Sequence, residues 1–113
     1  MSTAIRFKPE PLRSLAFGSI GAGYTAIGTA LDNPTRIFFL QNLTDETLMF
    51  SFGGLEDHLV LSAGGYLLID VTANKSMSHG FYIAENERIY VKQVGAPSTG
   101  AVYLSTVYGD TGL

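Results

Sequence analysis

The sequence predicts an all-β fold, an antiparallel β-sandwich, and three observations lead to this prediction. Turn-forming residues recur along the body of the chain, for example Asn33-Pro34, Gly53-Gly54 and Gly64-Gly65. The runs between the turns are short, rich in β-branched and aromatic residues, and about 8–12 residues apart, as in sandwiches and barrels. No window of about 11 residues or more carries an apolar stripe at helical spacing without a glycine, so we expect no helix.

The clearest of the expected strands alternate between two faces. Leu48, Phe50 and Phe52 share one face, because successive side chains of a strand point in opposite directions. The run 102–107 alternates in the same way. We expect the strands to form a jelly-roll-like sandwich. In chain order the expected strands are 13–20, 24–31, 35–41, 47–52, 58–61, 66–71, 81–84, 88–93 and 101–108.

One expected strand, Ile37-Phe38-Phe39-Leu40, is apolar on both faces, and two interpretations of it stay open. It is either a central strand covered on each side or a strand with one face turned toward another subunit. We expect Ile37 and Phe39 to be covered within the protein. Phe38 and Leu40 are then candidates for contact with a neighbouring subunit, because large exposed apolar patches are uncommon on monomers.

The first residues differ from the rest and predict an extended N-terminal arm. Pro9 and Pro11 fix φ and remove two backbone donors, which favours extended backbone over helix or central strand. We therefore divide the chain into an arm, 1–12, and a β-sandwich domain, 13–113.

Composition limits the class of protein. The chain has 113 residues, enough for one domain, and only 15% of them are charged, against about 25% in typical domains. A surface so poor in charge is expected to be covered in part by other protein. No apolar run approaches the ~20 residues of a membrane span, and residues 1–8 lack the apolar block of a secretory signal, so we expect a protein that is made in a cytoplasm and binds no membrane.

The charges are unevenly distributed. Arg6, Lys8 and Arg13 stand in or beside the arm, whereas the chain between Arg36 and Lys75 has only acidic charges. The acidic residues are either a solvated rim of loops or the surface across which the arm of another copy lies. Candidates for a subunit interface are Arg6, Phe7, Lys8, Phe38, Leu40, Asp45, Glu46, Glu56 and Asp57.

No motif predicts chemistry. Asp57-His58 with Ser51 or Ser62 is a poor catalytic set, because neighbouring strand residues point apart and no Gly-x-Ser-x-Gly elbow is present. With no cysteine and no spaced acidic loop, we expect no metal. The glycines of 18–23 lack the dinucleotide order, and a pI near 5.1 without a basic stripe argues against nucleic acid. We expect no enzyme and no cofactor.

The order of segments resembles the small structural proteins encoded among the virion assembly genes of tailed bacteriophages, near those for head–tail connection. The resemblance covers about residues 13–109, with Gly-Gly at 53–54 where Asp-Gly is more usual. It rests on Arg13-Ser14-Leu15, Phe17-Gly18-Ser19-Ile20, Tyr24-Thr25-Ala26-Ile27-Gly28, Asn33-Pro34, Arg36-Ile37, Gln41-Asn42-Leu43-Thr44-Asp45, Phe50-Ser51-Phe52-Gly53-Gly54, Asp57-His58, Ile69-Asp70-Val71-Thr72-Ala73-Asn74-Lys75, Ile89-Tyr90-Val91-Lys92, Pro97-Ser98-Thr99-Gly100, Val102-Tyr103 and Tyr108-Gly109.

The resemblance implies a non-enzymatic building block of the head–tail connector, collar or tail. Its implied partners are further copies of itself, in a ring, and virion proteins such as portal or tail components. It would be made in the host bacterial cytoplasm and end in the virion. The alternative is a carbohydrate- or receptor-binding sandwich whose loops at one end present aromatics, with Tyr66, Tyr82 and Tyr103 as candidates.

Overall fold

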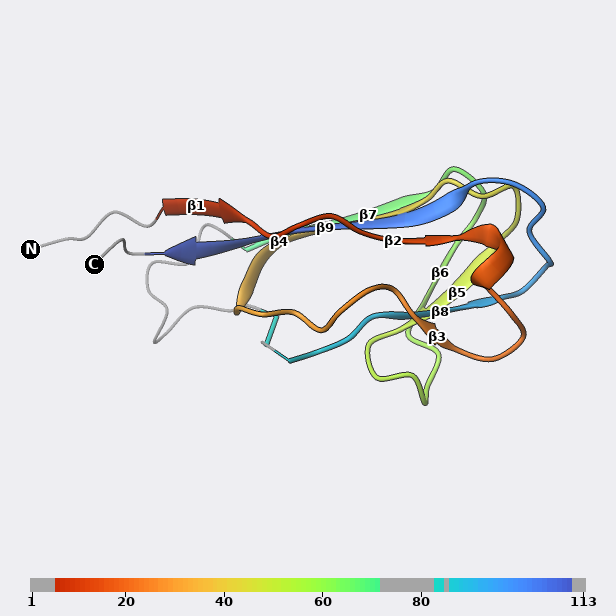
Figure 1. The fold of residues 1–113 in the computed structure, drawn as a ribbon, viewed down its shortest axis with the longest axis horizontal. Coiled ribbons are helices and arrows are strands. Elements are labelled where there is room, and N and C mark those ends of the chain that lie inside the picture. Colours follow the sequence, from red (N-terminus) through yellow and green to blue (C-terminus); the bar gives the residue numbers. More distant parts are fainter. Residues whose placement is uncertain (1–5, 72–82, 85, 111–113) are drawn as a thin grey trace, which may run out of the picture.

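A computed structural model describes residues 6–71, 83–84 and 86–110, and it is all-β. Two antiparallel sheets lie one above the other (Figure 1), which confirms the predicted β-sandwich. Sheet A has the order β1-β9-β4-β7, with β2 also on β9, and sheet B has the order β3-β8-β5-β6. The strands are β1 (Arg6–Pro9), β2 (Arg13–Ala16), β3 (Thr25–Ala26), β4 (Thr35–Asn42), β5 (Leu48–Ser51), β6 (Leu59–Leu61), β7 (Tyr66–Asp70), β8 (Tyr90–Gln93) and β9 (Ala101–Asp110).

The strands pair in a nested order. β5 pairs with β6, β4 with β7, β3 with β8, and β2 with β9, so each pair encloses the previous one in the sequence. Three further pairings, β1 with β9, β4 with β9 and β5 with β8, complete the two sheets. This is the winding of a jelly roll, in which the chain folds as one long hairpin that is rolled into a sandwich.

The core lies between the sheets and corrects our assignment of the two faces of β4. Phe38 and Leu40 have no exposed surface, so they do not meet a neighbouring subunit. Their partners on β9, Thr106 and Leu104, are also buried, and cross-strand partners share a face. Because both faces of β4 are apolar, only this register tells which one turns inward. The core cluster consists of Ile20, Ile27, Phe38, Leu40, Leu48, Phe50, Ile89, Val91, Val102 and Leu104.

The described part of the expected arm is extended, and it is paired with the domain. β1 lies against the C-terminal half of β9, with Arg6 opposite Asp110, and β2 lies against the N-terminal half. The edge strand is interrupted between β1 and β2 at residues 10–12, where Pro11 has no backbone N–H to donate. The arm and the first domain strand are therefore two parts of one sheet edge.

Two of the expected strands are shorter than their composition indicated. Within 24–31 only β3 is a strand, and the run 13–20 ends in a 3₁₀ turn at Phe17–Ser19. Of the run 81–84, residues 81 and 82 lie outside the described residues, and Ile83 forms an isolated bridge with Thr35. The alternation in β5 and β9 is confirmed, because Leu48, Phe50, Val102 and Leu104 are buried.

The molecule is elongated, with extents of 53 × 23 × 20 Å. β1 lies at one end of it, and the β4–β5 and β8–β9 connections lie at the other (Figure 1). Among the described residues, no helix has the length and apolar character needed to span a membrane.

Candidate functional site

The strongest candidate is the side of sheet A that faces away from sheet B. Three rows of paired residues run across β7, β4 and β9 there, and we call them the outer face of sheet A. The rows are Asp70-Ile37-Val107, Leu68-Phe39-Ser105 and Tyr66-Gln41-Tyr103. Apolar and aromatic side chains dominate these rows, and Asp70 is the one carboxylate among them; none holds a lysine or an arginine.

This face is open to solvent at β7 and half-buried at β4. Leu68 is 55% exposed and Tyr66 is 65% exposed. The Tyr66 ring meets the ring of Phe39 edge to face, with centroids 5.7 Å apart and planes at 69°, an arrangement that aromatic rings favour. The contact orients Tyr66 over the sheet.

A polar cluster occupies the other side of the sandwich and involves one of the predicted interface residues. The Tyr24 hydroxyl donates to Asp57 Oδ1, and Lys92 Nζ lies 3.0 Å from the same oxygen. The ammonium also lies 4.8 Å from the centroid of the Tyr24 ring, within cation–π range. Burial and then the hydrogen bond to Asp57 raise the pKa of Tyr24 to about 12. The hydrogen bonds from Tyr24 and Lys92 lower the pKa of Asp57.

The other acidic candidates lie in loops, and one of them, Asp45, accepts hydrogen bonds from a second loop of the same chain. Both carboxylate oxygens of Asp45 accept hydrogen bonds from Ser98, and one also accepts from the Thr99 N–H. The Ser98 hydrogen bonds lower the pKa of Asp45. Asp45 and Glu46 lie in the β4–β5 connection, at the end of the molecule away from β1. Glu56 is exposed in the β5–β6 loop.

A buried ion pair stabilises the interruption between β1 and β2, and the sequence did not predict it. Arg13 Nη2 donates to Glu10 Oε1 at 2.8 Å, and both side chains are at most 5% exposed. Arg13 also donates to Thr106 Oγ1 and to the carbonyls of Thr29 and Ala30. Burial alone would raise the pKa of Glu10, but the hydrogen bonds from Asn33 and Arg13 and the charge of Arg13 lower it.

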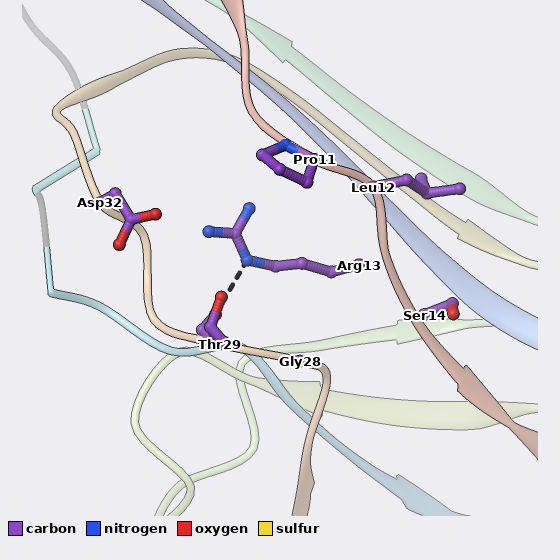
Figure 2. Close-up of a pocket in the computed structure, with 7 residues that line it drawn as sticks. All are labelled: Pro11, Leu12, Arg13, Ser14, Gly28, Thr29 and Asp32. Atoms are coloured by element: carbon purple, nitrogen blue, oxygen red, sulfur yellow. Dashed lines mark hydrogen bonds between the residues drawn. The ribbon is translucent and has the colours of Figure 1, made fainter.

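The same arginine crosses the hollow drawn in Figure 2, which has a volume of about 460 Å³. The Arg13 side chain reaches from the start of β2, next to Pro11 and Leu12, to the loop at Thr29, where the dashed line marks one of its hydrogen bonds. Because each nitrogen of this guanidinium already donates to the chain, the hollow is an anchor for the N-terminal strands and offers no free cation to a ligand.

The residues once considered for catalysis form a turn. Ser51 is fully buried, and its hydroxyl oxygen accepts hydrogen bonds from the N–H groups of Gly53 and Gly54. His58 Nδ1 accepts from the Phe52 N–H at 2.9 Å. Ser51 Oγ lies 3.4 Å from the same nitrogen of His58, while Asp57 accepts its hydrogen bond from Tyr24, so the three side chains do not form a chain of hydrogen bonds. His79 lies outside the described residues, and within them no three His, Asp or Glu side chains gather to hold a metal ion.

Comparison with protein-family models, with curated proteins and with solved structures finds no match. The likeness to bacteriophage structural proteins therefore stays a prediction, and arguments about function depend on the fold and on the surface described above.

Proposed function

We propose that this chain is a non-enzymatic structural protein of a phage virion that acts by assembling with copies of itself. The outer face of sheet A carries the proposal, because it combines exposed apolar side chains with a near absence of charge. Interface centres have the same character: aromatic side chains are enriched and charged ones depleted. The jelly roll is also a fold of viral capsid domains, which is an analogy at the level of fold only.

The positions of the charges support a contact between the two ends of neighbouring copies. Arg6 and Lys8 lie on β1 at one end, and Asp45 lies at the other end. β1 and the β4–β5 loop of the same chain lie at opposite ends, but in a head-to-tail arrangement β1 of one copy lies beside the β4–β5 loop of the next. Contacts of this heterologous kind close into a ring when the rotation between subunits allows it. Portal or tail components are then the remaining partners.

The mass of the protein in solution tests this proposal. Light scattering at two concentrations, about 10 μM and about 200 μM, should give an oligomer whose share grows with concentration, as mass action requires. Negative-stain microscopy should then show particles of defined shape. A strictly monomeric protein at both concentrations, also in the presence of candidate portal or tail proteins, would refute it.

One observation favours a second candidate, a carbohydrate-binding module. Tyr66 and Tyr103 flank Gln41 in one row of the outer face of sheet A, so the strands that carry the two tyrosines lie about 10 Å apart, two strand spacings, with an amide side chain on the strand between them. They lie on the sheet and not in end loops, and Tyr82 lies outside the described residues. Specific signals on a glycan array that disappear in Tyr66→Ala would favour recognition, whereas silence would favour assembly.

A further inference from the structure

We infer that the outer face of sheet A packs against the same face of a second copy, related by a twofold axis along its middle row, Leu68-Phe39-Ser105. The inference rests on the proposed self-assembly and specifies one contact within it. A twofold contact is isologous, so it gives a closed pair, and the head-to-tail contact of the arm then joins pairs.

The chemistry of the face favours the same face of a second copy as its partner. A basic or an acidic partner would find almost no opposite charge on it, and the best match is a flat surface that is itself apolar and neutral. The axis along the middle row superposes the first row of one copy on the third row of the other. Asp70 then meets Tyr66 of the second copy, whose hydroxyl is a hydrogen-bond donor. The carboxylate is thus placed beside a donor, and the two copies of Asp70 lie apart.

The size of the face suits a stable pair. Three strands about 4.8 Å apart cover about 14 Å, and the eight residues of β4 cover about 27 Å, so the face measures roughly 390 Å² in projection. Accessible area exceeds projected area because side chains stand out from the sheet. A standard interface buries about 800 Å² per partner, and faces of antiparallel sheets pack closely at about 10 Å.

A charge placed on the middle row of the face tests the inference. On the proposed axis, Leu68→Lys brings two ammonium groups face to face without water, so the dissociation constant of the pair should rise at least about 100-fold. Val60→Lys is the matched control, because Val60 is 54% exposed, also lies on a strand, and belongs to sheet B. Tyr66→Lys is a second variant of the same face. All three sites are more than half exposed, and thermal unfolding verifies that each variant folds.

The axis makes a second, independent measurement possible. Because the chain has no cysteine, Ser105→Cys introduces a single thiol, and the proposed axis places it opposite its own copy. Because the packed faces lie about 10 Å apart, too far for a direct disulfide, a short bismaleimide reagent should link the two thiols into a covalent dimer. Met49→Cys, which is also half-buried on a strand but belongs to sheet B, should stay monomeric on a non-reducing gel.

The outcomes separate this inference from the proposed function. A smaller mass for Leu68→Lys and Tyr66→Lys, with Val60→Lys unchanged, supports the face-to-face pair. If all three variants keep the mass of the wild type, or if Val60→Lys dissociates equally, the inference is overturned while self-assembly stands. If the wild type is itself monomeric, both fail. An oligomer that is sensitive to Leu68→Lys but gives no crosslinked Ser105→Cys dimer overturns the twofold axis.

Discussion

At the scale of single residues, buried polar groups fix the path of the chain where strands end. Asn42 is fully buried at the end of β4, and its amide nitrogen donates to the carbonyls of Glu46, Leu61 and Ser62. Its amide oxygen accepts from the N–H and the hydroxyl of Thr44. This one side chain therefore ties sheet A to the β5–β6 side of the sandwich.

Gly100 provides a sharp prediction at this scale. Its φ is +87°, and a Cβ there would overlap the carbonyl oxygen of Leu43. Gly100→Ala should lower the free energy of unfolding by at least about 2 kcal/mol through strain and displaced backbone. Gly64 has φ +78° with open space around it, so Gly64→Ala isolates the cost of φ, about 1 kcal/mol. Urea unfolding measures both; equal losses would contradict the close approach at Gly100.

The Glu10–Arg13 pair predicts a dependence of stability on pH. Glu10→Gln leaves a buried guanidinium without its counter-charge, and we expect it to cost about 3 kcal/mol at pH 7. The pKa of Glu10 is lowered in the folded chain, so its contribution is present above the ordinary pKa of 4.5 and is lost as the pH falls through the lower folded value.

The difference in unfolding free energy between the wild type and Glu10→Gln should therefore be constant near neutrality and shrink below about pH 4. Urea titrations at several pH values measure it. Glu56→Gln removes an exposed carboxylate in a loop and should stay within about 0.5 kcal/mol of the wild type. A difference for Glu10→Gln that is independent of pH would contradict the ion pair.

At the scale of elements, β1 is the part most suited to assembly. Phe7 is 68% exposed, and β1 is anchored to the domain by β9 and by the pair at its C-terminal side. Deleting residues 2–9 keeps Glu10 and Arg13, so the sandwich should retain its fold while self-assembly weakens. The double variant Arg6→Glu and Lys8→Glu should weaken it too, more strongly at low salt. An unchanged oligomer mass after the deletion would exclude a role for the arm.

The sequence predicted the bounds of strands well where turn residues end them. It predicted the orientation of a strand poorly where only pairing with a distant strand determines it. β4, β5 and β9 were placed within a residue or two, because glycine, asparagine and proline end them. The orientation of β4 was wrong, since Phe38 and Phe39 are equally apolar and only the pairing with β9 separates them. The Glu10–Arg13 network was missed because it closes on Thr106, 93 residues after Arg13.

The sequence predicted that a charge-poor surface exists, but it did not predict which strands carry that surface. A charge-poor composition indicates a covered surface, but the three rows exist only once β7, β4 and β9 are in register. Asp45 and Asp57 were proposed for an interface from charge alone. Their oxygens bind Ser98, Tyr24 and Lys92 of the same chain, which no local pattern indicates.

At the scale of the whole molecule, the nested pairing has a consequence for how the protein is made. β9 is the last of the described strands to leave the ribosome, yet β1, β2 and β4 all pair with it. Sheet A therefore cannot be completed until β9 has emerged. Until then the apolar strands are open to wrong partners, as is typical of folds built from distant contacts, so a truncated or stalled chain should aggregate and not accumulate as a partly folded domain.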